Sequence, residues 1–131
     1  MKPSSDDPPK KILVITVDEA IGEIVVSMLQ TAGYECSAAS RHEETLGALK
    51  RASDYDLVFC QVAALEKEEG FLTWALGIGS GIPMVTAAGR APGYIPRVIL
   101  ERGRFLQMPF EREQLLTIIE ETLAAAVRKT D

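Results

Sequence analysis

Residues 11–19 read Lys-Ile-Leu-Val-Ile-Thr-Val-Asp-Glu, a run that begins apolar and ends in two acids. Its apolar part, Ile12 to Ile15, does not alternate with polar residues. Such a run is typical of a strand buried on both faces, as in a parallel sheet covered by helices. Helical periodicity follows, so the corner at Asp18 is expected at the carboxyl end of the strand. In open α/β sheets, ligands and chemistry gather at that edge.

The composition places the chain among ordinary globular domains. Its 131 residues, 47% of them hydrophobic, suffice for one domain with a substantial core. The net charge of −5, without a Lys/Arg cluster, argues against nucleic-acid binding. No apolar run reaches the ~20 residues of a membrane span, and no signal peptide is recognisable. Cys36 and Cys60 lie in apolar segments and are expected to be reduced, so we expect a cytoplasmic protein.

Strands and helices are expected to alternate along the chain. Residues 1–10 should form a flexible tail, 11–127 a single domain and 128–131 a second tail. Five strands are expected at 11–16, 35–39, 56–61, 83–87 and 105–107. Five helices are expected at 18–32, 40–52, 68–77, about 96–102 and 111–127. Such alternation predicts a right-handed, parallel α/β sandwich.

The first and last helices carry the clearest apolar stripes. The inward-facing residues should be Ile21, Ile24, Val25, Met28 and Leu29 in the first, and Leu115, Ile118, Ile119, Leu123 and Val127 in the last. Gly33 follows the first helix, where a residue in the left-handed region would end it.

Five local motifs occur in a telling order. They are Ile12-Leu13-Val14-Ile15 before the acidic corner, Ala32-Gly33-Tyr34, Asp56-Leu57-Val58, Pro83-Met84-Val85 and Met108-Pro109-Phe110. In this order and spacing the chain resembles, from Lys11 to Val127, the receiver domain of two-component response regulators. The resemblance implies a flavodoxin-like (βα)5 three-layer sandwich with strand order 2-1-3-4-5. It also implies that the first and last helices share one face, and that the peptide bond before Pro109 is cis.

The chemistry of that family can be compared position by position. A receiver takes a phosphoryl group on an aspartate that ends strand three. An acidic pair after strand one holds Mg²⁺, a Thr or Ser ends strand four, and a Lys precedes the last Pro-Phe. The cation and the lysine offset the charge of the acyl phosphate. The matching positions here hold Thr16 and Val17 for the acidic pair, Gln61 for the acceptor, Ala88 for the Thr/Ser and Met108 for the lysine.

These replacements are chemically coherent. The amide of Gln61 cannot form an acyl phosphate, and Val17 cannot ligate a hard cation, while Thr16 offers only a neutral oxygen. Met108 supplies no positive charge, so anion and cation are lost together. We interpret the chain as a degenerate receiver that is not an enzyme and holds no metal or other cofactor.

Asp18 and Glu19 leave an alternative open, because Asp18 lies one position beyond the expected acidic pair and a slip could bring it towards the cleft. The simpler interpretation is that both acids favour the positive end of the following helix. Thr16 and Glu19 also have the spacing of a capping box. Cys60 has no basic neighbour in sequence and is expected to be a packing residue.

The resemblance implies a module of phosphorelay signal transduction. The favoured hypothesis is a pseudo-receiver that contacts a protein partner, or a second copy, without phosphorylation. The family's partner face would comprise Ile95, Arg97, Ile99, Arg104, Phe105 and Glu113. The alternatives are a phosphoacceptor that uses Asp18 with Mg²⁺, and a small-ligand sensor in the neutralised cleft. No nucleic acid or membrane is expected as a partner.

Overall fold

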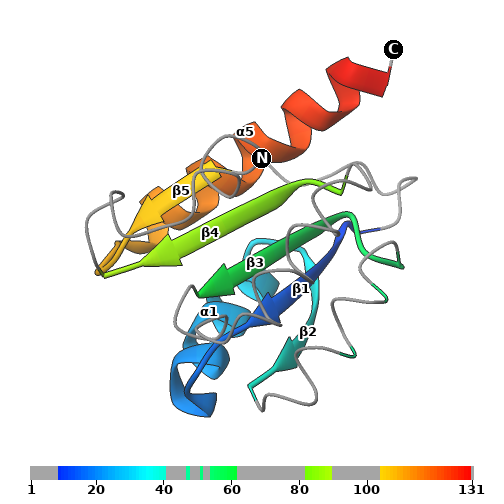
Figure 1. Ribbon diagram of the computed structural model, residues 1–131. Coiled ribbons are helices and arrows are strands. Elements are labelled where there is room, and N and C mark those ends of the chain that lie inside the picture. Colours follow the sequence, from blue (N-terminus) through cyan, green and yellow to red (C-terminus); the bar gives the residue numbers. More distant parts are fainter. Residues whose placement is uncertain are drawn as a thin grey trace.

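The computed structural model describes residues 9–40, 47, 51, 54–61, 82–89 and 104–130 (Figure 1). These residues form β1 (Lys11–Ile15), α1 (Glu19–Thr31), β2 (Glu35–Ala39), β3 (Leu57–Gln61), β4 (Met84–Ala88), β5 (Arg104–Gln107) and α5 (Arg112–Thr130). Each strand lies within one or two residues of its predicted position. Of the predicted helix at 40–52, only residues 40, 47 and 51 are described, and the predicted helices at 68–77 and 96–102 lie outside the described residues.

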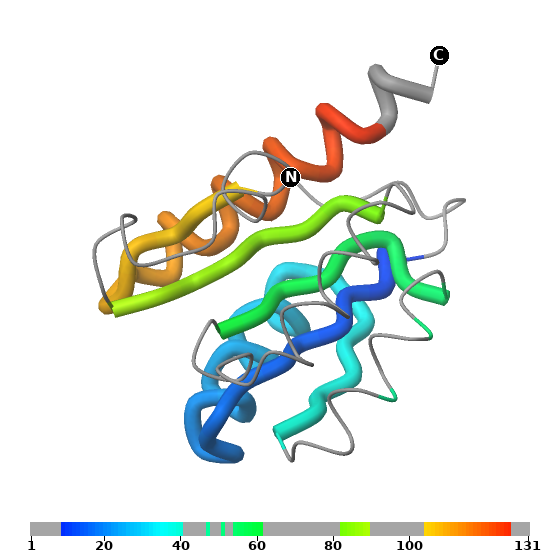
Figure 2. The backbone as a smooth tube through the Cα atoms, in the orientation of Figure 1, coloured from blue at the N-terminus to red at the C-terminus, as the bar shows by residue number. Residues whose placement is uncertain are grey.

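The five strands form one parallel sheet in the order β2-β1-β3-β4-β5, which confirms the predicted topology. Figure 2 shows the blue β1 between the cyan β2 and the green β3. Val14 pairs with Ala38 on one side and with Phe59 on the other. Every residue of β4 is buried, whereas the edge strand β2 exposes three of its five residues. Continuous apolar runs therefore became the interior strands, as burial on both faces requires.

Asp56 aligns the first and third strands at their start. Its backbone nitrogen donates to the Lys11 oxygen at 2.8 Å, and its carboxylate Oδ2 accepts from the Lys11 nitrogen at 2.8 Å. This reciprocal pair lies just outside β3 and sets the parallel register in which Ile12 faces Leu57. The Asp56 carboxylate of the Asp56-Leu57-Val58 motif thus helps to hold β1 and β3 in register.

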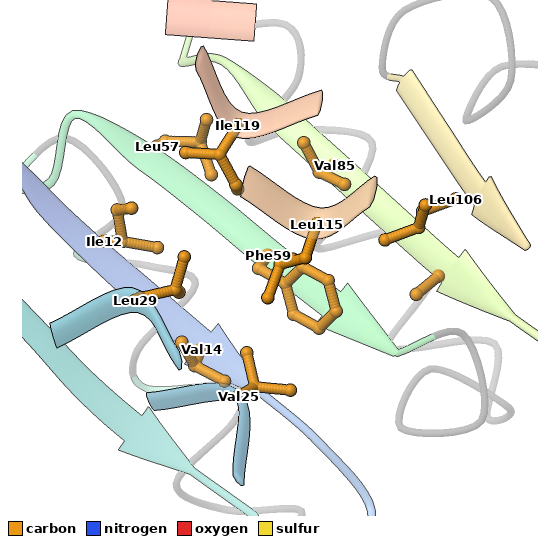
Figure 3. Close-up of a cluster of buried hydrophobic side chains, with 11 residues drawn as sticks. Ile12, Val14, Val25, Leu29, Leu57, Phe59, Val85, Leu106, Leu115 and Ile119 are labelled. Atoms are coloured by element: carbon orange, nitrogen blue, oxygen red, sulfur yellow. The ribbon is translucent and has the colours of Figure 1, made fainter. Parts of the chain in front are cut away.

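The core on one face of the sheet joins α1 to α5. Figure 3 shows these side chains meeting between the sheet and the two helices. The cluster comprises Ile12 and Val14 of β1, Val25 and Leu29 of α1, Leu57 and Phe59 of β3, Val85 and Ala87 of β4, Leu106 of β5, and Leu115 and Ile119 of α5. Full burial of an aliphatic or phenyl side chain stabilises the fold by roughly 1.5–3 kcal/mol. The first and last helices therefore share one face, as predicted.

The predicted apolar stripe of α1 is confirmed in all but one residue. Val25 and Leu29 are buried, and Ile21 and Met28 pack against the cluster. Ile24, however, is 56% exposed, so its assignment to the inward face was wrong. The helix buries the arc that contains Gly22, Val25 and Leu29, and Ile24 lies outside that arc.

The end of α1 follows the prediction. Gly33 has a φ of 103°, and its nitrogen donates to the Gln30 oxygen at 3.0 Å. The Tyr34 nitrogen donates to the Leu29 oxygen at 3.1 Å, which closes the cap. Only glycine adopts this backbone conformation without strain, and Gly33 therefore ends the helix.

The last helix is longer than predicted. It begins at Arg112 and continues to Thr130, into the residues that the sequence assigned to a tail. Leu115 and Ile119 are fully buried, and Ile118 and Leu123 pack against the core, whereas the side chain of Val127 lies outside the described part. Helix-forming residues after 127 provide no stop signal such as glycine or proline, so the helix continues.

Candidate functional site

The matching positions of the receiver pocket lie together at the carboxyl edge of the sheet. The Val17 nitrogen donates to Oε1 of Gln61 at 3.0 Å, which joins the end of β1 to the end of β3. The Met108 nitrogen donates to the Ala88 oxygen at 2.8 Å, which joins the loop after β5 to β4. Since Gln61 is paired with Ala87 in the sheet, the two contacts belong to adjoining strands.

Thr16 is used inside the fold and is only 1% exposed. Its Oγ1 donates to the Asp18 oxygen at 3.0 Å, and its nitrogen donates to the Ala39 oxygen at 3.0 Å. A Cβ atom at Gly22 would lie 2.9 Å from the same Oγ1, closer than real contacts allow. Glycine at position 22 therefore lets α1 lie directly on Thr16.

Asp18 is the N-cap of α1. Its Oδ1 accepts from the Ala20 nitrogen at 2.8 Å, and its backbone oxygen accepts from the Gly22 nitrogen at 3.0 Å. The predicted capping box of Thr16 and Glu19 was wrong, because the side chain that caps the helix is that of Asp18. An aspartate here satisfies an orphan helix N–H and meets the positive end of the dipole. The interpretation that Asp18 serves the helix start is thus confirmed.

Gln61 places a neutral group at the end of β3, the position that matches a receiver's phosphoacceptor in the resemblance. Its side chain is half-buried, and its amide oxygen accepts the hydrogen bond from Val17. A backbone N–H can only donate, so this contact identifies Oε1 as the atom that faces Val17. The sequence did not predict this hydrogen bond, because no pattern among the residues next to Val17 or Gln61 indicates it.

Ala88 and Met108 line the other side of the edge. Ala88 is 6% exposed and ends β4, and the half-buried Met108 packs against the apolar core. The Met108-Pro109 peptide bond is cis, as predicted. Next to it, the rings of Phe110 and Phe59 meet edge to face, with centroids 6.1 Å apart. Where a receiver has an ammonium group, this chain has a thioether in apolar contact.

The side chains at this edge do not fit a magnesium ion. Mg²⁺ is held through carboxylate oxygens in strict octahedral geometry. Among Thr16, Val17, Asp18 and Gln61 there is one carboxylate, and one of its oxygens already accepts the bond from Ala20. Across the residues that the structure describes, no three His, Cys, Asp or Glu side chains come together as a metal site would need.

Both cysteines are free thiols with suppressed ionisation. Cys60 is fully buried, and burial raises the pKa of its thiol. The sulfur of Cys60 lies 3.5 Å from the backbone oxygen of Gln61. Burial also raises the pKa of Cys36 to about 11. A nucleophilic cysteine needs a lowered pKa, so neither thiol has the environment of a reactive one.

The predicted partner face is described only in part, because Ile95, Arg97 and Ile99 lie outside the described residues. Arg104 and Glu113 are exposed, and Phe105 is half-buried. The Nη1 atom of Arg104 lies 3.9 Å from Oε1 of Glu121, which links β5 to α5 at the surface. Exposed pairs of this kind contribute little stability.

The opposite edge of the sheet carries a feature that the sequence did not suggest. A cavity of about 230 Å³ is lined by Lys11, Glu35, Cys36, Ser37, Asp54 and Tyr55.

Within the part of the chain that the structure describes, no helix has the length and apolarity to cross a membrane.

Among the comparisons with known proteins, the one with solved structures supports the fold. No protein-family model matches the sequence, and no curated protein matches it. Solved structures do. A CheY-like response regulator receiver domain protein from Methanospirillum hungatei is 20% identical, with a TM-score of 0.77, over 92% of this chain and 98% of that one. A response regulator receiver protein from Sinorhizobium medicae is 21% identical, with a TM-score of 0.77, over 90% and 97%.

A longer protein contains the same fold as one part. NtrX from Brucella abortus is 21% identical, with a TM-score of 0.78, over 93% of this chain but only 28% of the NtrX chain. Together with the strand order, these similarities show the flavodoxin-like fold of response regulator receiver domains.

Proposed function

We propose that this chain, which has the receiver-domain fold, is a pseudo-receiver of two-component signal transduction that acts through protein contacts and is not phosphorylated. The observation that carries the proposal is the contact of Gln61 Oε1 with the Val17 nitrogen at 3.0 Å. At the position where a receiver needs a nucleophilic carboxylate, this chain has the amide of Gln61. The oxygen of that amide accepts a hydrogen bond from the backbone of Val17, which stands at a position that matches a receiver's metal ligand.

The surrounding chemistry supports the same function. Phosphoryl transfer to a carboxylate needs positive charge to stabilise the transferring group. The described side chains at this edge supply none, because Met108 replaces the lysine and packs against the core. Among Thr16, Val17, Asp18, Gln61, Ala88 and Met108, only Asp18 carries a charge, and its Oδ1 caps α1.

The alternative that Asp18 accepts the phosphoryl group is disfavoured by the same geometry. The Asp18 carboxylate holds the Ala20 nitrogen at 2.8 Å at the start of α1. Phosphorylation of Oδ2 would turn Oδ1 into the neutral carbonyl oxygen of an acyl phosphate and so weaken the cap. Among the described residues, no group of three His, Cys, Asp or Glu side chains stands there to hold a metal.

A non-enzymatic signalling module must act through its surface. We propose that β5 and α5 contribute to a contact with a protein partner or a second copy, with Arg104, Phe105 and Glu113 as the described members of that face. Arg104 and Glu113 are exposed there and are available for such contacts.

Intact-mass spectrometry tests the proposal. The chain and a competent receiver are incubated with acetyl phosphate and Mg²⁺, and the mass of each is measured. We expect a phosphoryl adduct on the control alone. A second sample carries Gln61→Asp, which restores the carboxylate but neither the metal ligands nor the lysine, and it should also stay unmodified. A stoichiometric adduct on the wild-type chain would overturn the proposal.

A further inference from the structure

The corner between β1 and α1 is tied to the sheet at two points within the described residues. The Thr16 nitrogen donates to the Ala39 oxygen of β2 at 3.0 Å. The Val17 nitrogen donates to Oε1 of Gln61 at the end of β3, across 44 residues of sequence, at 3.0 Å. The bonds around Asp18, by contrast, join residues two to four positions apart and form with the helix itself.

We propose that Gln61 is a positioning residue, whose side-chain amide acts as a latch that holds the β1–α1 corner against the end of β3. The role goes beyond the proposed function, because the latch would operate whatever the chain binds and whether or not it meets a phosphodonor. A partner that contacts this edge would then meet one backbone conformation.

The neighbouring packing explains why one bond can have this effect. Thr16 and Gly22 are buried against each other below the corner, and this packing restrains that part of the backbone. Val17 lies above them with its side chain 51% exposed, so packing alone does not hold it. The hydrogen bond from its backbone nitrogen to Gln61 supplies the missing restraint.

Glutamine suits this task better than asparagine or methionine. Its amide oxygen reaches the Val17 nitrogen at 3.0 Å. Asparagine is one methylene shorter, and methionine has similar length but no comparable acceptor. Glutamate keeps the acceptor oxygen and can therefore replace the bond.

Amide hydrogen exchange, followed by NMR on the full chain, tests the latch. In Gln61→Met the Val17 amide should exchange about 2- to 10-fold faster, the effect of losing one neutral hydrogen bond. Gln61→Glu should keep the slow rate. Amides in the middle of β1 and β3, such as those of Val14 and Phe59, report global unfolding and should change less than that of Val17.

Gln107→Met is the matched control. Gln107 is exposed at the end of β5, and its Nε2 donates to the oxygen of its own neighbour Met108 at 3.2 Å. This variant should leave the Val17 rate unchanged. An unaltered Val17 rate in Gln61→Met, or an equal rise in Gln107→Met, would overturn the latch. Neither result bears on the phosphoryl adduct, so the two proposals fail separately.

Discussion

Oε1 of Gln61 accepts a hydrogen bond from the backbone nitrogen of Val17 at 3.0 Å, between residues that match the acceptor and a metal ligand of a receiver. The bond is neutral at both ends. Under the proposed function, the carboxylate and the cation of a receiver, each of which would be costly to place here without the other, are both replaced. The Val17 nitrogen and the Gln61 amide oxygen then satisfy each other. Under the proposed pseudo-receiver function, the neutral side chains and the local structure of this edge therefore have one explanation.

The close approach of Gly22 to Thr16 predicts that Gly22→Ala destabilises the protein. Alanine favours helix by about 1 kcal/mol over glycine, but its Cβ would lie 2.9 Å from a buried, β-branched side chain that cannot move away. Overpacking of about 1–3 kcal/mol should outweigh the helical gain. Urea unfolding measures the difference, and a double-mutant cycle with Thr16→Ala isolates the contact. If Gly22→Ala is as harmful without the Thr16 side chain, the steric explanation is wrong.

The cap at Asp18 predicts a graded response to substitution. Asp18→Ala should lower the free energy of unfolding by about 1 kcal/mol, because the Ala20 nitrogen loses its acceptor. Asp18→Asn should be nearly neutral, since asparagine caps helices about as well. Thermal unfolding of both variants at equal ionic strength makes the comparison. Equal losses in the two variants would mean that the charge, not the hydrogen bond, is what matters.

The two thiols predict a fall in stability at alkaline pH. An unfolded thiol ionises with a pKa of about 8.5, whereas burial raises the pKa of Cys36 to about 11 and that of Cys60 further. Above about pH 8.5 the unfolded state loses protons that the folded state keeps, so the free energy of unfolding decreases as pH rises. Burial and the Glu120 carboxylate also raise the pKa of Tyr34, which adds to the decline at higher pH.

Urea unfolding between pH 7 and pH 10.5 measures this slope. The double variant Cys36→Ala, Cys60→Ala should show a shallower decline than the wild-type chain. A decline of unchanged steepness would exclude the thiols as its cause.

The exposure of Ile24 predicts an unequal pair of truncations on α1. Leu29→Ala should lower the free energy of unfolding by about 2–5 kcal/mol, because Leu29 is fully buried in the core. Ile24→Ala should change it by no more than about 0.5 kcal/mol, since a half-exposed side chain loses little on truncation and alanine favours helix. Equilibrium unfolding of both variants settles the point, and comparable losses would show that Ile24 is buried in solution.

Much of the architecture was determined by the sequence alone. The apolar runs of β1, β3 and β4, the cap at Gly33 and the alternation of strands and helices are patterns among neighbours along the chain. The parallel order and the shared face of α1 and α5 followed from the resemblance and from the rules that govern such alternation. The positions that match a receiver's acceptor and metal ligands were assigned from the resemblance, and the parallel sheet brings their strand ends to one edge.

Other features depended on the assembled molecule. Ile24 had the spacing of a core residue, yet the arc that α1 buries is set by where the helix meets the sheet. The choice of Asp18 over Thr16 as the cap followed from burial of Thr16 against Gly22. The bond between Val17 and Gln61 exists only because parallel pairing brings two strand ends together across 44 residues. Contacts of that kind depend on distances in the folded molecule, and a pattern among neighbouring residues cannot predict them.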